Sequence, residues 1–354
     1  MHFGSLNGLR CFCILAVLWH HAPAWTNMDD PLRLWQSGFL GVDFFFVLSG
    51  FLITTLLLRE EDRNGNFSVK GFYWRRCLRI IPVYFLVVST LGFYYIGIEG
   101  QTEYLGILPF YYLFLSNFLA SDIPMLGPTW SLSVEEQFYL VWPLLLLFAP
   151  RKYILHILAG LITLNVLAVT GALGSIGIKP LEFPPLVIEM FTATYAPLFI
   201  GSGLAIFLHN KAGFETLRQI FGQKYSAPLM FLLLLAVVNY RPPDVTGWPN
   251  LVIHFTMAAC LASIVIREDH ALRSVFAFRP IARVGQISYG IYLYHLIGLH
   301  IVVVGLSKVG WQGSWSIFVL YSLVSFVIAE LSFRYYETPF LNLRHRRKPM
   351  RLAK

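Results

Sequence analysis

The sequence has 354 residues, of which 56% are apolar and only 13% are charged. Ordinary globular domains carry about 25% charged residues, so the composition excludes a soluble protein and predicts one polytopic membrane domain. The formal net charge of +8 does not by itself imply nucleic-acid binding. The four cysteines are scattered along the chain and predict neither a disulfide framework nor a metal site.

Apolar runs of about 17 to 25 residues indicate transmembrane helices. The chain contains ten such runs, at 6–25, 39–58, 80–98, 131–149, 153–173, 187–208, 226–240, 250–266, 285–305 and 315–335. An eleventh run at 104–119 is short and contains Pro109. The expected fold is therefore all-α, with about ten spans and a segment near 104–119 of a different kind.

The distribution of basic residues decides the status of the segment 104–119. With ten spans and a cytoplasmic N-terminus, the inner connections and the tail hold 21 Lys and Arg residues, and the outer connections hold four. Counting 104–119 as an additional span would reverse this bias after that point, against the positive-inside rule. We therefore expect a re-entrant or interfacial helix there, with its broken backbone satisfied by protein.

The expected organisation is a membrane domain at 1–335 and a basic cytoplasmic tail at 336–354. The tail sequence "RHRRKPMRLAK" is typical of a segment that contacts lipid headgroups. Both termini are expected on the cytoplasmic side.

Ionisable residues inside the spans are costly and point to function. Arg10 and His21 are eleven residues apart, which places them on nearly the same helix face and about 16 Å apart along the axis. The topology puts Asp43 and Glu135 at a depth similar to that of His21. A carboxylate on one imidazole nitrogen can orient a catalytic histidine, so we predict His21, Asp43 and Glu135 as catalytic residues.

The fourth span carries a polar and aromatic stripe. Ser131, Glu135, Tyr139 and Trp142 recur at helical spacing, as expected of a helix that lines a cavity. Glu136 points about 100° away from Glu135 and is not included. The alternative is that Glu135 only hydrogen-bonds a neighbouring helix.

A basic cluster precedes the third span, with Arg75, Arg76 and Arg79 in "FYWRRCLRIIP". Arg76 and Arg79 share a helix face, and guanidinium groups bind phosphates well. A cytosolic phosphorylated donor could dock here. The alternative is a juxtamembrane run that only sets topology or contacts headgroups.

Six sequence blocks together resemble a known family. They are "LNGLRCFCILAVLWHH", "GFLGVDFFFVLSGFLITTLLL", "FYWRRCLRIIPVYF", "TWSLSVEEQFYLVWPLLLL", "ISYGIYLYHL" and "YYETPF". In this order they are similar to acyltransferase family 3, the polytopic membrane O-acyltransferases that modify bacterial carbohydrates. The family pattern of a basic residue, ten intervening residues and a histidine falls on Arg10 and His21. Its double-arginine motif falls on Arg76 and Arg79.

The resemblance implies ten spans in the bacterial cytoplasmic (inner) membrane and no permanently bound cofactor. It also implies an acyl-CoA donor, most often acetyl-CoA, on the cytoplasmic side, held by Arg10, Arg75, Arg76 and Arg79. The acceptor would be a hydroxyl of an extracytoplasmic glycan, such as exopolysaccharide or lipopolysaccharide, or of its lipid-linked precursor. Further substrate contacts are expected from Trp130, Ser131, Tyr139 and His295.

Several alternatives stay open at this stage. His21 could take the acyl group itself or act as a general base on the acceptor. Fused members of the family carry an extracytoplasmic domain that does not follow here, so a separate acceptor-binding protein or a homo-oligomer is a further expectation. Rival functions are acylation of a small molecule such as a macrolide, secondary transport, and a non-catalytic scaffold.

Overall fold

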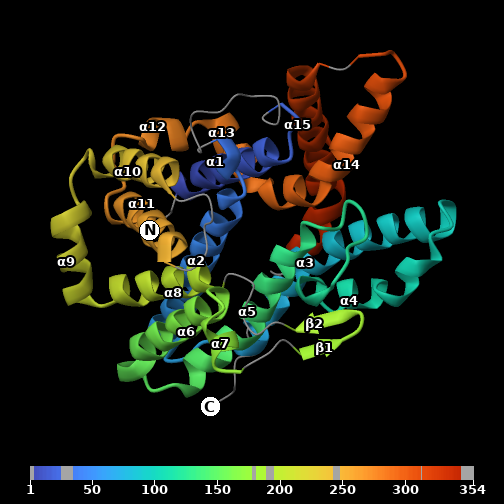
Figure 1. Ribbon diagram of the computed structural model, residues 1–354. Coiled ribbons are helices and arrows are strands. Elements are labelled where there is room, and N and C mark those ends of the chain that lie inside the picture. Colours follow the sequence, from blue (N-terminus) through green and yellow to red (C-terminus); the bar gives the residue numbers. More distant parts are fainter. Residues whose placement is uncertain are drawn as a thin grey trace.

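The computed structural model describes residues 4–24, 35–177, 181–188, 195–241, 248–311 and 313–343, and the statements below concern these residues. The chain is a bundle of helices with one small hairpin (Figure 1). Helices dominate because an apolar chain in lipid must satisfy its backbone hydrogen bonds within itself.

A helix is present at each of the ten predicted positions. These are α1 (Gly4–His20), α2 (Leu40–Asn64), α3 (Val69–Gly92), α5 (Thr129–Phe148), α6 (Ile154–Val169), α8 (Ala196–His209), α10 (Ser226–Tyr240), α11 (Trp248–Ile266), α14 (Ser288–Ser307) and α15 (Ser314–Leu331). The π-helical turns η3 (Phe93–Ile98) and η7 (Ser332–Glu337) extend α3 and α15, and α16 (Thr338–Asn342) follows η7. The shorter helices are η2 (Trp35–Ser37), η6 (Arg151–Tyr153), α7 (Ala172–Ser175), α9 (Lys211–Phe221), α12 (Arg273–Phe276) and α13 (Arg279–Gln286).

The number of membrane spans is only partly as predicted. Among the described residues, six helices are long and apolar enough to cross a membrane, or seven if α9 and α10, which are bent by 77°, form one span. Helices α1, α8 and α10 have 17, 14 and 15 residues, which is short for a span. Helix α5 is long enough, but Glu135, Glu136 and Gln137 interrupt its apolar sequence.

A two-stranded antiparallel hairpin departs from the all-α expectation. Strand β1 (Leu181–Phe183) pairs with β2 (Leu186–Ile188), and an isolated bridge joins Leu119 to Leu186. Because β2 occupies the beginning of the span predicted at 187–208, α8 begins only at Ala196. The predicted start of that span is wrong by about nine residues.

The segment 104–119 is broken into short pieces, as predicted for a segment that does not span. These are η4 (Thr102–Gly106), α4 (Leu108–Tyr112) and η5 (Ser116–Phe118). Neighbouring helices satisfy part of its backbone: the Tyr84 hydroxyl donates to the Tyr111 carbonyl at 2.9 Å, and the Gln137 amide donates to the Phe114 carbonyl at 2.8 Å. The polar Gln137 in α5 therefore serves this irregular segment.

Helices α2 and α8 cross in backbone contact. A Cβ atom added at Gly50 would lie 2.0 Å from the Leu198 carbonyl oxygen, and one at Gly201 would lie 2.1 Å from the Val47 carbonyl oxygen. Small residues let membrane helices approach this closely, where van der Waals packing replaces the hydrophobic driving force. The crossing fixes α2, which borders the cavity described below.

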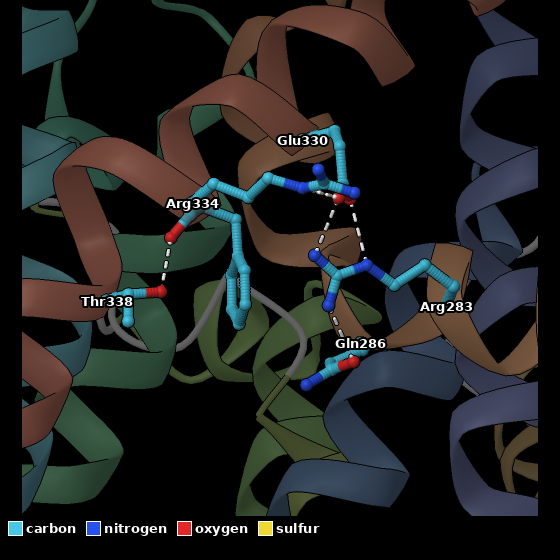
Figure 2. Close-up of polar contacts among 6 residues, drawn as sticks. Arg283, Gln286, Glu330, Arg334 and Thr338 are labelled. Carbon is cyan, nitrogen blue, oxygen red and sulfur yellow. Dashed lines mark hydrogen bonds and ion pairs between the residues drawn. The ribbon is translucent and has the colours of Figure 1, made fainter.

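Helix α1 is packed against α2, α13 and α14 (Figure 1). A Cβ atom at Gly285 of α13 would lie 1.6 Å from the Asn7 carbonyl oxygen, so the two backbones touch. Figure 2 shows how α13 is held in turn: Arg283 donates twice to the Glu330 carboxylate of α15, at 2.8 and 2.9 Å. Arg334 of η7 pairs with the same carboxylate at 2.5 Å. Because α13 contacts α1 at Asn7, this network also holds the N-terminal end of α1 in place.

Candidate active site

A polar cavity of about 90 Å³ lies where α1, α2, α3, α5 and α14 converge. Its polar lining consists of Arg10, Ser49, Arg76, Arg79, Ser131, Glu135, Glu136, Tyr139, Ser288, Tyr289 and Tyr292. Six of the predicted site residues, from three of these helices, thus share one cavity: Arg10, Arg76, Arg79, Ser131, Glu135 and Tyr139.

Three arginines face this cavity. Among the described residues, none of their guanidinium groups forms an ion pair within 4.0 Å or a hydrogen bond to another side chain. The Arg76 guanidinium carbon lies 5.0 Å from the centroid of the Tyr139 ring, a cation–π contact that holds the side chain over α5. Guanidinium donors that face a cavity without a fixed acceptor suit an anionic ligand.

Two carboxylates share the cavity with the arginines. Glu135 lies there, close to the Ser49 and Tyr139 hydroxyls, whereas the prediction from depth had placed it with His21. Glu136, which the helical angle excluded, lines the same cavity because the cavity spreads around α5 toward α3 and α14. The sequence pattern that could have identified Glu136 is the pair of adjacent glutamates in an otherwise apolar helix, since each glutamate would be costly if it faced lipid.

His21 lies directly after the end of α1, against His295 of α14. The ring centroids are 4.7 Å apart. The Nδ1 atom of His21 donates to the Val17 carbonyl at 3.0 Å, and Nδ1 of His295 donates to the Tyr292 carbonyl at 2.6 Å. Because a carbonyl can only accept, each imidazole carries a hydrogen on Nδ1, and in its neutral form each keeps a lone pair on Nε2.

Tyr292 connects the cavity to this imidazole pair. Its ring lines the cavity and lies 5.6 Å from the His295 ring. Its hydroxyl donates to the Pro128 carbonyl at 2.8 Å and hydrogen-bonds Ser131 at 2.7 Å. His21 is not among the cavity-lining residues, so the cavity that holds Arg10 reaches only as far as Tyr292, whose ring adjoins His295 and through it His21.

Asp43 does not orient His21, in contrast to the prediction. Its carboxylate lies 3.0 Å from Nε2 of His254 in α11, and both side chains are buried. The depth of Asp43 was compatible with either histidine, but its position around the axis of α2 directs it to α11. Sequence reasoning missed His254, which is a lone histidine in the apolar run 250–266.

Two other predicted residues lie outside the cavity. Arg75 is exposed and pairs with Glu60 at 2.8 Å. Trp130 is 36% exposed and packs edge-on against Phe46, with ring centroids 6.2 Å apart. Arg75 points away from the cavity although it adjoins Arg76, because consecutive residues diverge by about 100° on a helix.

A family model described as an acyltransferase domain matches residues 3–333 of the chain. The chain belongs to acyltransferase family 3. The matched range of this acyltransferase family 3 domain includes the whole cavity and both imidazoles of the pair. The family resemblance stated from the sequence blocks is confirmed.

Relatives in the same family carry more specific names. The chain is 30% identical to "Peptidoglycan O-acetyltransferase OatA" of Listeria monocytogenes, over 95% of this chain and 55% of the relative. It is 28% identical to "O-acetyltransferase OatA" of Staphylococcus aureus, over 95% of this chain and 56% of the relative. The chain thus spans little more than half the length of these relatives. No solved structure matches the chain.

Proposed function

We propose that this acyltransferase family 3 chain moves an acetyl group from acetyl-CoA on the cytoplasmic side to a hydroxyl of a cell-wall glycan on the other side of the membrane. One observation carries the proposal: a cavity with three guanidinium groups reaches Tyr292, which adjoins a pair of imidazoles. Arginines suit the phosphates of the donor, and an imidazole suits acyl transfer.

The size of the cavity indicates which part of the donor enters it. Small-molecule pockets typically measure roughly 300 to 1,000 Å³, and this cavity measures about 90 Å³. It is too small for a nucleotide, so in this proposal the nucleotide stays outside the cavity and only part of the pantetheine arm enters it. The donor phosphates would then meet Arg76 and Arg79 from the cytoplasmic end, where the basic connections are expected.

The two cavity glutamates fit this assignment. They are the acidic side chains among three arginines, so basic groups outnumber acidic ones in the cavity, and the cavity can attract an anion while the glutamates reduce the repulsion between the arginines. Glu135 is accordingly a positioning residue for Arg10 and Arg76 in this proposal, rather than an orienting partner of His21. Tyr292 must shift for the acetyl group to reach His21.

The acceptor class comes from the relatives. One relative is named for O-acetylation of peptidoglycan, which favours a cell-wall glycan over the exopolysaccharide and lipopolysaccharide considered from sequence. In either case the new bond is an ester between the acetyl carbonyl and a sugar hydroxyl. The membrane would be the bacterial cytoplasmic membrane, with both termini cytoplasmic.

The test uses the full chain purified in detergent, with radiolabelled acetyl-CoA and soluble glycan fragments that contain muramic acid. We expect transfer of the label to the glycan. In His21→Ala the rate of transfer should fall by about 10² to 10⁴, the usual contribution of such a group. His300→Ala is the matched control, because His300 is exposed on α14 and contacts Tyr94. Transfer at the wild-type rate by His21→Ala at equal abundance would contradict the proposal.

A further inference from the structure

The imidazole pair has an unusual hydrogen-bond pattern. His21 and His295 each donate from Nδ1 to a carbonyl one turn earlier on their own helix. Two neutral imidazoles held this way present only acceptors at Nε2, so neither can donate to the other. The pair therefore offers two bases side by side, with centroids 4.7 Å apart.

The Nε2 atom of His295 is buried and has no hydrogen-bond partner among the described residues. The whole residue is only 1% exposed. Buried polar atoms in native structures are nearly always satisfied, and an exception calls for an explanation. A ligand that brings a hydroxyl donor to this point would supply the missing partner.

Other polar side chains considered for the site have partners or positions elsewhere. The Tyr292 hydroxyl is bound to Pro128 and Ser131, and Asp43 is paired with His254. Glu135 lies in the arginine cavity. Of these groups, His295 is the one that adjoins His21 and keeps a lone pair without a donor.

We propose that His295 is a second catalytic residue, the general base for the acceptor hydroxyl, while His21 carries the acetyl group. This assignment rests on the proposed function. In the first step, Nε2 of His21 attacks the thioester carbonyl: an N–C bond forms, the C–S bond breaks, and the CoA thiolate leaves. Since Nδ1 keeps its hydrogen on the Val17 carbonyl, the acetylated ring is a cation.

In the second step, the acceptor hydroxyl attacks the acetyl carbonyl and its proton passes to Nε2 of His295. The O–C ester bond forms, the N–C bond breaks, and the electron pair returns to Nε2 of His21. The proton on His295 then balances the thiolate released earlier, so the products are the ester and CoA thiol. A second base is needed because the acetylated His21 has no free lone pair.

The test separates the two steps in the purified full chain. His295→Asn places an amide N–H near the position of Nδ1, which keeps the hydrogen bond to Tyr292, and removes the base. We expect this variant to release a burst of about one CoA per enzyme and to retain radiolabelled acetyl, released by neutral hydroxylamine. Its transfer to glycan should fall by at least 10².

Three controls make the result decisive. His21→Ala should show neither burst nor label, and His300→Asn on the same helix should behave like the wild type. His295→Gln, which puts an amide near Nε2 instead, should also retain the burst. A His295→Asn rate within about threefold of the wild type, or an equal loss of both steps, would overturn the role of His295. Wild-type protein that transfers no acetyl group would instead contradict the proposed function itself.

Discussion

The Asp43 carboxylate lies 3.0 Å from Nε2 of His254, and the pair is buried between α2 and α11. We expect Asp43→Ala and His254→Ala each to lower the free energy of unfolding by about 1 to 2 kcal/mol, the range for polar contacts between membrane helices. The double variant should lose little more than either single variant. Unfolding in mixed micelles, arranged as a double-mutant cycle, measures this coupling.

Strictly additive losses would show that the two side chains do not interact. Because Asp43 contacts His254 and not His21, acetyl transfer per folded molecule should fall less than tenfold in Asp43→Asn. A loss as large as that of His21→Ala would restore the catalytic role expected from sequence.

Arg76 and Arg75 provide a matched pair on α3. Arg76 lines the cavity, whereas Arg75 is exposed and paired with Glu60. A hydrogen bond to a charged group contributes about 1.5 to 3 kcal/mol, so Arg76→Ala should raise the KM for acetyl-CoA roughly 10- to 100-fold. Arg75→Ala should leave it unchanged. Steady-state kinetics with both variants checks this, and equal effects would remove Arg76 as a donor contact.

The crossing of α2 and α8 should tolerate no added methyl group at Gly201. A Cβ there would lie 2.1 Å from the Val47 carbonyl oxygen, while one at Gly203, two residues later, would meet Leu158 at an ordinary 3.7 Å. We expect Gly201→Ala to destabilise the protein by about 3 kcal/mol and Gly203→Ala to be nearly neutral. Thermal unfolding in detergent compares the two, and similar midpoints would contradict the backbone contact.

His270 should make stability depend on pH. It lies in the loop between α11 and α12, 2% exposed, with Nε2 3.1 Å from the Ser5 hydroxyl. Burial, and secondarily the Arg273 guanidinium, lower the pKa of His270 below 6.5, and Asp269 opposes this. The unfolded chain therefore binds the proton first, and stability is lost as the pH falls below about 6.5.

The measurement is the unfolding midpoint at pH 7.5 and at pH 5.5. We expect His270→Gln to lose less stability on acidification than the wild type, since glutamine can still hydrogen-bond Ser5 but does not titrate. The same loss in both proteins would assign the pH dependence to other groups.

Sequence reasoning placed the helices well, because long apolar runs leave few alternatives to a helix in lipid. It also grouped Arg10, Arg76 and Arg79 as donor contacts, and the three share one cavity, but it assigned Glu135 to the depth of His21, whereas Glu135 lies among these arginines. Depth alone does not say which neighbour a side chain faces, and so Asp43 was assigned to His21 instead of His254.

The sequence patterns could not predict contacts between distant segments of the chain. The hairpin that delays α8 to Ala196 is bridged to Leu119, some 67 residues before its partner Leu186. The pairing of His21 with His295 likewise depends on how α14 packs beside α1. Glu136 was excluded because a helical angle describes one face, whereas the cavity covers more than one face of α5.

Hydrogen bonds from Gln137 link the irregular segment 104–119 to α5, a helix that lines the cavity. Gln137 donates to the Phe114 carbonyl and to Asn117 at 2.7 Å, and accepts from Tyr195 at 2.5 Å. The next residue toward the N-terminus is Glu136, which lines the cavity. Any molecule that displaces this segment must therefore either break the Gln137 hydrogen bonds or shift α5. A shift of α5 would move Glu136, so binding at the segment 104–119 would change the cavity that holds the arginines.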